Sequence, residues 1–174
     1  EANRTITSTS FDNDNTSNQE FYLNAIKKQF TQTFTNVLFA TNAATLLAGS
    51  EKELNELVDK AGIPVATTLL GMSSMDADHP MYVGWPGMHG NYGANVLTNS
   101  CDVLIAIGMR FDDRITGDLA TYAKQAKIVH IEIDPAEVDK NVKADAPVVG
   151  DAKAALRALL PLIKPTEHLD WRAE

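Results

Sequence analysis

One unbroken apolar run constrains the fold more than any other feature of this sequence. Residues 102–109 read Asp-Val-Leu-Ile-Ala-Ile-Gly-Met, a short stretch rich in branched side chains. Such a run is typical of a strand buried on both faces of a parallel sheet. Similar runs occur at 36–41, 64–68, 127–134 and 147–150. Because segments of helical pattern separate them, we predict an α/β fold with a doubly wound, mostly parallel sheet flanked by helices.

Helix signals lie between these runs. Ser50, with Glu53 three residues later, matches a capping box, and Gly62 is a typical residue for the end of that helix. A short helix is expected over about 92–99. Asp151 has the chemistry of an N-cap for a last helix that reaches about Ile163.

Length and composition describe one domain between two polar ends. The chain has 174 residues, of which 44% are hydrophobic and 22% charged, enough to bury a core of its own. Residues 1–20 are mostly Thr, Ser, Asn and Asp and are predicted to form a disordered arm or linker. A short amphipathic helix is expected over 21–32. We therefore predict a single α/β domain over 21–164 and a C-terminal tail over 165–174.

The charge and the cysteine content exclude several classes of protein. A net charge of −8 without basic clusters argues against nucleic-acid and anionic-membrane binding. No apolar run approaches membrane-spanning length, and no signal peptide is visible. The single cysteine, Cys101, cannot form an internal disulfide and precedes the buried run, as expected for a core residue. The four histidines show no metal-ligand spacing. We expect a cytoplasmic protein without a metal site.

Two motifs carry the candidate chemistry. Residues 84–93 read Gly-Trp-Pro-Gly-Met-His-Gly-Asn-Tyr-Gly, and glycine at every third position suits a loop that lies close to a ligand. A tight surface loop explains these glycines equally well. Residues 110–114 read Arg-Phe-Asp-Asp-Arg and directly follow the buried run, where open α/β sheets bind their ligands. Arginine suits a carboxylate or a phosphate, and a self-paired ion cluster is the alternative.

A nucleotide is the ligand that such a sheet first suggests, but the usual fingerprint is missing. The first strand is followed by Thr-Asn-Ala-Ala-Thr at 41–45, not by G-x-G-x-x-G. Glu132, on a later strand, could accept hydrogen bonds from ribose hydroxyls, or it is a solvated carboxylate at a strand end. Asp151 fits an N-cap better than a ligand contact. Among the histidines, only His89 in the glycine loop is a candidate for ligand contact.

Three motifs together resemble the central domain of acetohydroxyacid synthase, also called acetolactate synthase. They lie at residues 87–90, 110–117 and 131–135, and the resemblance extends over about 49–163. It implies the Rossmann-like central domain of a thiamine-diphosphate enzyme. In that family the domain holds FAD as a structural cofactor. The whole enzyme is a transferase of branched-chain amino-acid biosynthesis that condenses pyruvate with a second 2-ketoacid.

The resemblance also assigns roles to residues. Arg114 is similar to the arginine that orients the carboxylate of the second ketoacid, with Asp113 and Met88 lining the channel to it. The positions that the resemblance implies for FAD lie at strand ends and in the glycine loop. They are Thr68, Leu69, Leu70, Gly87, Met88, His89, Gly108, Met109, Arg110, Asp112, Arg114, Ile115, Glu132, Ile133, Asp151 and Ala152.

The family's thiamine-diphosphate site is not represented in this sequence. That site uses a Gly-Asp-Gly motif for Mg²⁺ and an activating glutamate in another domain, and this chain has no Gly-Asp-Gly. Thiamine diphosphate and Mg²⁺ are thus expected in the parent enzyme and not in this domain, which alone is expected to hold no catalytic residue and to be inactive. The implied partners are the other two domains of the parent chain, a second catalytic subunit, a regulatory small subunit and 2-ketoacid substrates.

Two alternatives to this function stay open. The family has a glycine-rich turn after the first strand, beside the flavin pyrophosphate, and this chain has Thr-Asn-Ala at 41–43. That difference predicts weak FAD binding. It also leaves room for a non-catalytic scaffold or subunit-contact module whose flavin site has decayed. The other alternative is the central domain of a different thiamine-diphosphate oxidase or carboligase.

Overall fold

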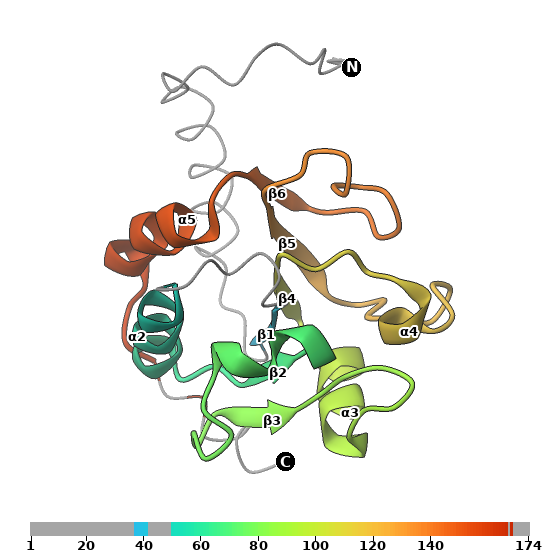
Figure 1. The fold of residues 1–174 in the computed structure, drawn as a ribbon, viewed down its shortest axis with the longest axis horizontal. Helices are drawn as coiled ribbons and strands as arrows, with labels where there is room; N and C mark the ends of the chain where they lie inside the picture. The colour runs from blue at the N-terminus through green and yellow to red at the C-terminus, as the bar shows by residue number, and fades with distance from the viewer. Residues whose placement is uncertain (1–36, 42–49, 167, 169–174) are drawn as a thin grey trace.

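A single parallel sheet organises the computed structural model, which describes residues 37–41, 50–166 and 168. Every pair of neighbouring strands is parallel. From edge to edge (Figure 1) the strands are β3 (Tyr82–Gly84), β2 (Val65–Thr67), β1 (Val37–Thr41), β4 (Val103–Ile107), β5 (Lys127–Glu132) and β6 (Ala146–Val149). The predicted α/β fold with a parallel sheet is confirmed, and β4 is an interior strand.

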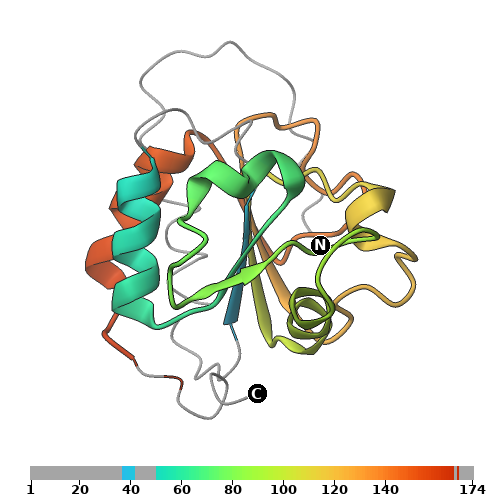
Figure 2. The same cartoon turned by 60° about the horizontal axis from the view of Figure 1, so that its bottom comes forward.

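Helices cover both faces of this sheet (Figure 2). One face carries α2 (Glu51–Ala61) and α5 (Ala152–Leu159), which pack against each other. The other face carries α3 (Tyr92–Ser100) and the short α4 (Asp113–Thr116). Two 3-10 helices, η1 (Leu69–Ser74) and η2 (Leu160–Leu162), follow β2 and α5. The sheet is therefore doubly wound, as predicted.

The two faces of β4 supply two separate parts of the core. Val103, Ile105 and Ile107 pack into the cluster formed with α2 and α5. Leu104 and Ala106 point to the opposite side, into the cluster under α3. Successive side chains of a strand face opposite sides, and here both sides are covered. This is why the run in the sequence is apolar without interruption.

The predicted helix ends are partly right. Gly62 ends α2 in a left-handed conformation, with φ of 62°, and Asp151 caps α5 because its Oδ1 accepts from the Ala154 N–H at 2.9 Å. The capping box at Ser50 is wrong. Ser50 has a helical backbone and its side chain makes no capping hydrogen bond. Glu53 Oε1 instead accepts from Arg157 Nε at 2.8 Å, a contact between α2 and α5 that sequence spacing does not reveal.

Three further expectations differ from the structure. Residues 69–84, for which no helix or strand was predicted, contain η1 and β3, and the pairing of β3 with β2 includes a register shift. The short helix α4 was not predicted. The strand predicted over 127–134 ends at Glu132, because that side chain accepts hydrogen bonds from the next two backbone N–H groups.

Several predictions lie outside the described residues, namely the polar arm, the helix over 21–32, the turn at 42–45 and the end of the tail. Within the part of the chain that the structure describes, no helix is both long enough and apolar enough to cross a bilayer. The same residues contain no group of three or more His, Cys, Asp or Glu placed to hold a metal ion.

Candidate functional site

A cleft opens where β2 and β4 end, on either side of the central strand β1. In this strand order, β1 is the point at which the sheet reverses its direction of growth, and open α/β sheets bind ligands at that point. The segments after β2 and β4 form the walls. The lining residues are Thr68, Leu69, Leu70, Met109, Arg110, Phe111, Asp112, Arg114 and Ile115.

The structure brings together one group of the predicted FAD positions and leaves another apart. With the exception of Phe111, every residue of the cleft wall was predicted from the resemblance. Glu132, Ile133, Asp151 and Ala152 lie instead at the ends of β5 and β6 and do not line the cleft. A ligand that touched both groups would have to extend along the carboxyl edge of the sheet.

The two arginines of the Arg-Phe-Asp-Asp-Arg motif differ in their partners. Arg110 Nη2 lies 3.3 Å from Asp112 Oδ2, so the alternative of a self-paired ion cluster holds for this arginine. Asp112 also caps α4, since its Oδ1 accepts from the Arg114 N–H at 3.2 Å. The Arg114 guanidinium is exposed and has no hydrogen-bond or ion-pair partner among the described residues. Of the two, Arg114 is the arginine available to a ligand.

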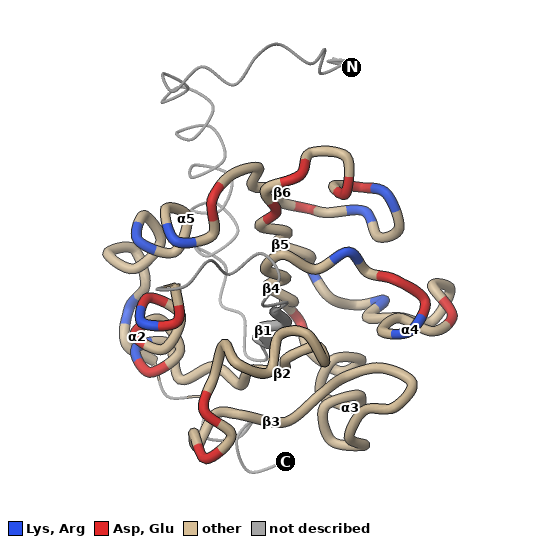
Figure 3. Tube along the Cα trace, in the orientation of Figure 1, with Lys and Arg blue, Asp and Glu red and all other residues tan. Residues whose placement is uncertain are grey.

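The wall of the cleft that faces the Arg114 segment carries little charge. Figure 3 shows that β2, β3, η1 and α3 form a region almost without charged residues. In the sequence, Asp76 and Asp78 are the only charged residues between Ala61 and Cys101, counting histidine as neutral. An anion in the cleft would therefore meet the positive charge of Arg114 on the wall after β4. It would meet no acidic side chain on the wall after β2.

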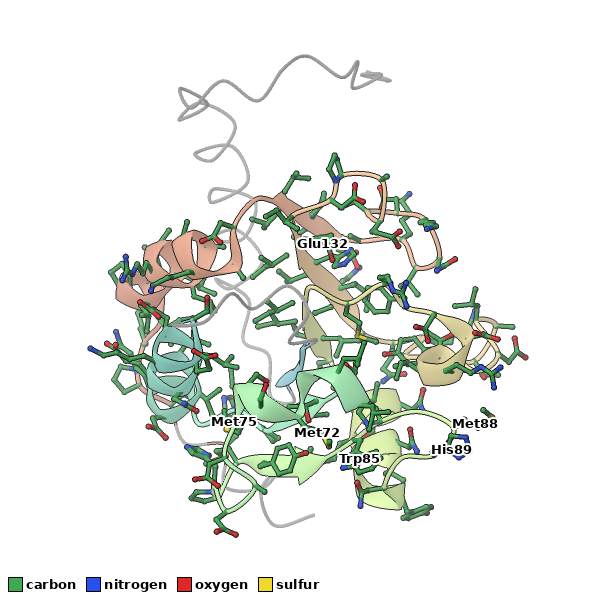
Figure 4. All side chains as sticks on the ribbon, viewed as in Figure 1. Met72, Met75, Trp85, Met88, His89 and Glu132 are labelled. Atoms are coloured by element: carbon green, nitrogen blue, oxygen red, sulfur yellow. The ribbon has the colours of Figure 1, made fainter. Side chains whose placement is uncertain are left out.

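The glycine loop lies against the turn that carries Arg114. The Met88 N–H donates to the Arg114 carbonyl oxygen at 2.8 Å. Gly87 has φ of +104°, and a Cβ built on it would lie 2.5 Å from that same oxygen. Only glycine allows this close approach. Figure 4 shows Met88 and His89 at the outer end of the loop, where both are exposed.

One residue that lines the cleft carries a buried hydroxyl without a partner among the described residues. Thr68 is 7% exposed, and its Oγ1 has no hydrogen-bond partner among the described residues. A buried polar group without a partner costs free energy, and such groups in folded proteins usually bind water or a ligand. Thr68 Oγ1 is thus a candidate ligand contact.

The carboxyl end of β5 uses its charged side chain differently. Glu132 is 3% exposed, and its Oε1 accepts from the N–H groups of Ile133 at 2.9 Å and Asp134 at 3.2 Å. Its Oε2 has no partner among the described residues and lies 3.9 Å from His130 Nε2. Glu132 is therefore not a solvated carboxylate, and one of its oxygens remains available.

Sequence reasoning missed two residues that connect β5 with the cleft. His130 is fully buried on β5, and burial lowers its pKa below the usual range, so the ring is neutral. Phe111 packs edge-on against it, with ring centroids 5.0 Å apart, and adopts a positive φ of 53° that is uncommon for this residue type. A histidine in the middle of an otherwise apolar strand is the signal that could have identified this contact.

Cys101 is a core residue, as predicted. Its side chain is fully buried and its Sγ donates to the Thr98 carbonyl oxygen at 3.3 Å. Burial, reinforced by the neighbouring Asp102 carboxylate, raises the pKa of Cys101 to about 12. A thiol of this kind is not a nucleophile at neutral pH.

Comparison with known proteins decides the family. The model of the thiamine pyrophosphate enzyme central domain matches residues 35–159, well over half of the chain. The chain belongs to this family. The predicted resemblance is also confirmed by relatives, which are acetolactate synthases.

A probable acetolactate synthase large subunit of Methanocaldococcus jannaschii is 51% identical over 125 residues, which cover 72% of this chain and 21% of that protein. The acetolactate synthase isozyme 3 large subunit of Escherichia coli is 42% identical over 133 residues, covering 72% of this chain and 23% of that protein. An acetolactate synthase of Mycobacterium avium is 45% identical over 115 residues, 66% of this chain and 18% of that protein. The chain thus spans about a fifth of the length of these curated relatives.

Proposed function

We propose that this chain is the FAD-binding central domain of an acetolactate synthase large subunit and that it lines the channel for the second 2-ketoacid. The observation that carries the proposal is the Arg114 guanidinium, which lies exposed at the cleft without a partner among the described residues. A guanidinium can hold a carboxylate through two parallel hydrogen bonds. It would select 2-ketoacids over neutral aldehydes, with Met88 and Asp113 beside it.

FAD would lie extended along the carboxyl edge of the sheet. The cleft holds only about 150 Å³, below the roughly 300–1,000 Å³ typical of ligand pockets, so it fits one part of such a cofactor. Thr68 Oγ1 at one end and Glu132 Oε2 at the other are buried without a partner among the described residues, and both suit polar contacts. When bound, FAD would be a structural group that takes no electrons in the main reaction.

The remaining predicted contacts divide along this edge. Leu69 and Leu70 would accompany Thr68 beside the flavin ring. The middle of the cofactor would lie over residues 87–89 and 108–115. Ile133, Asp151 and Ala152 would join Glu132 around the adenosine. Asp151 already binds its own helix, because its Oδ1 accepts from the Ala154 N–H.

The reaction itself would take place outside this chain. Thiamine diphosphate and Mg²⁺ would be held by the other domains of the parent enzyme, a transferase that condenses pyruvate with a second 2-ketoacid. A second catalytic subunit and a regulatory small subunit are the proposed partners. The isolated chain would be inactive, since its contribution is to bind FAD and to orient a carboxylate.

Two observations favour a second candidate function. The sequence Thr-Asn-Ala at 41–43 stands in place of the family's glycine-rich turn, and the cleft is small. Both features fit a scaffold or subunit-contact module whose flavin site has decayed. A central domain from another thiamine-diphosphate oxidase or carboligase is less favoured, because the three relatives compared with this chain are all acetolactate synthases.

The visible absorbance of the purified chain separates these candidates. After incubation with FAD we expect weak binding that a fluorescence titration detects and that desalting removes. Thr68→Val removes the unpartnered hydroxyl and should weaken binding further, whereas Thr98→Val removes a buried hydroxyl of α3 that donates to the Ala94 carbonyl oxygen and should not. A chain that stays yellow through gel filtration would show that residues 41–43 tolerate the pyrophosphate. No FAD binding at any concentration would favour the scaffold.

A further inference from the structure

One side chain of α3 binds both backbone groups of Gly87. Asn95 Oδ1 accepts from the Gly87 N–H at 2.7 Å, and Asn95 Nδ2 donates to the Gly87 carbonyl oxygen at 3.0 Å. A side-chain amide that satisfies the donor and the acceptor of one residue fixes the orientation of that residue on both sides. Gly87 is therefore attached to the helix and cannot swing independently of it.

Gly87 is also the point at which the glycine loop touches the turn of Arg114. The next N–H, that of Met88, donates to the Arg114 carbonyl oxygen at 2.8 Å. A Cβ on Gly87 would lie 2.5 Å from that oxygen and 3.0 Å from the Ile115 Cα, so the two segments are in direct contact. Asn95 therefore fixes one of the two segments that meet at this contact, and the other segment carries Arg114.

The other hydrogen bonds of the loop do not connect the contact between Gly87 and the Arg114 turn to a helix. Asn91 Oδ1 accepts from the Trp85 N–H at 3.0 Å, and the Asn91 N–H donates to the Trp85 carbonyl oxygen at 2.8 Å, which closes the base of the loop. The Gly90 N–H donates to the Gly87 carbonyl oxygen at 3.0 Å, within the loop. Among the described residues, Asn95 is the side chain that connects this contact to a helix.

We propose that Asn95 is a positioning residue that sets the placement of Met88 relative to Arg114 and thereby the choice of the second 2-ketoacid. Both side-chain hydrogen bonds of Asn95 go to Gly87, so it acts on Met88 and Arg114 through that glycine. The inference rests on the proposed function, because it takes Arg114 as the group that receives the ketoacid carboxylate. A shift of the loop would change the space left for the ketoacid's side chain beside Met88.

Hydrogen exchange of the 174-residue chain tests the positioning itself. Asn95→Leu keeps the approximate size of the side chain and suits a helix, but it removes both hydrogen bonds to Gly87. We expect the Met88 amide, which does not bond to Asn95, to exchange about tenfold faster, a change that corresponds to one or two lost hydrogen bonds. The matched control is Asn99→Leu, one turn later on α3. The Asn99 side chain bonds to Ala123 and to the Asn95 backbone, so its loss should leave the exchange of the Met88 amide unchanged. An unchanged Met88 amide in Asn95→Leu would overturn the proposal.

Steady-state kinetics of the full-length large subunit that carries this chain test the consequence. In Asn95→Leu we expect the KM for the second 2-ketoacid to rise about tenfold, while CO₂ release from the first is retained and the product ratio between two competing ketoacids changes. Asn95→Asp keeps the acceptor for the Gly87 N–H and should lie between Asn95→Leu and the unchanged enzyme. Equal loss of CO₂ release and carboligation in Asn95→Leu would overturn the proposal.

The Arg114→Lys enzyme distinguishes a failure of this inference from a failure of the proposed function. If Arg114→Lys impairs use of the second ketoacid and Asn95→Leu leaves both KM and product ratio unchanged, the inference about Asn95 is wrong and the proposed function stands. If Arg114→Lys also leaves use of the second ketoacid unchanged, the proposed function of Arg114 is wrong.

Discussion

The cleft and the adjacent ends of β5 and β6 lie along the same edge of the sheet but use their polar groups in opposite ways. In the cleft, the Arg114 guanidinium and Thr68 Oγ1 have no partner among the described residues. After β5 and β6, Glu132 and Asp151 each bind backbone N–H groups of the next segment of the chain. The first region leaves the Arg114 guanidinium and Thr68 Oγ1 without a partner among the described residues, and the second uses one carboxylate oxygen of each acid to shape its own loops.

This difference originates in the local backbone at the end of each strand. The segment after β4, residues 108–112, leads into α4, and Asp112 provides the cap, so the Arg114 side chain takes no part in the turn. Glu132 ends its strand by accepting from the next two N–H groups, which occupies half of its carboxylate. A charged residue at a strand end is thus a ligand candidate only through the atoms that the local backbone leaves unbound, such as Glu132 Oε2.

The largest effect is expected for Arg114→Lys in the full-length large subunit. Lysine keeps the charge but loses the planar pair of donors, so the proposed contact with the second ketoacid's carboxylate should weaken, by up to roughly 2–4 kcal/mol if the whole contact is lost. The first decarboxylation needs no second substrate and should survive better. Acetolactate formation measured against CO₂ or acetaldehyde release separates the two steps.

Arg110→Lys is the matched control for this measurement, because Arg110 is already paired with Asp112. It should change acetolactate formation less. Equal loss of both steps in Arg114→Lys would mean that Arg114 mainly holds the domain or its flavin together, and the contrast between the two regions would disappear.

A smaller effect, on stability, is expected for Gly87→Ala. The backbone there has φ of +104°, and the new Cβ would meet the Arg114 carbonyl oxygen. A non-glycine residue in such a conformation costs about 1–3 kcal/mol. Urea unfolding of the chain measures it. Gly93→Ala, on α3 with nothing within 4 Å of its added Cβ, should be neutral or stabilising by up to about 1 kcal/mol. If both changes are neutral, the glycine loop is not docked on the Arg114 turn.

The smallest effect is expected in the β5 region, as a dependence of the free energy of unfolding on pH. Burial lowers the pKa of His130, and the carboxylates of Glu132, Asp139 and Glu137 oppose this only in part. Below a pH of about 6.5 the unfolded chain binds a proton that the folded chain resists. The free energy of unfolding should therefore be unaffected by His130 above that pH and fall below it, by at most about 1.4 kcal/mol per pH unit.

Urea unfolding at several pH values between about 5 and 7 tests this dependence. His130→Leu should flatten the pH dependence below about 6.5, and His89→Gln, a change in the exposed loop, should leave it as in the unchanged chain. If the free energy of unfolding changes with pH equally in His130→Leu and the unchanged chain, groups other than His130 cause the pH dependence.

Much of the fold could be predicted from the sequence because buried parallel strands produce a strong local pattern. The apolar residues of β2, β4, β5 and β6 are enough to identify these strands. They do not identify β3, because it lies in a glycine-rich segment, where pairing with β2 and not local pattern makes it a strand. The capping box failed for a related reason, since the long-range contact with Arg157 engages Glu53.

The candidate site could be predicted in its residues but not in its arrangement. The resemblance distinguished Arg114 from Arg110 by role, but only the structure shows that Arg110 is paired and that Arg114 is not. The same holds for Gly87, whose contact with the Arg114 turn joins segments far apart in the chain. Phe111 and His130 were missed because their contact depends on the packing of separate segments of the chain.

The burial of Cys101 makes the chain a convenient carrier for spectroscopic labels. With a pKa of about 12, the thiol is almost entirely protonated at pH 7, and it is out of reach of reagents in the folded state. It is also the only cysteine in the sequence. A second cysteine introduced at the exposed Met88 position would thus take up a fluorophore or spin label alone, without removal of the native thiol, and alkylation of Cys101 would report each opening of the core.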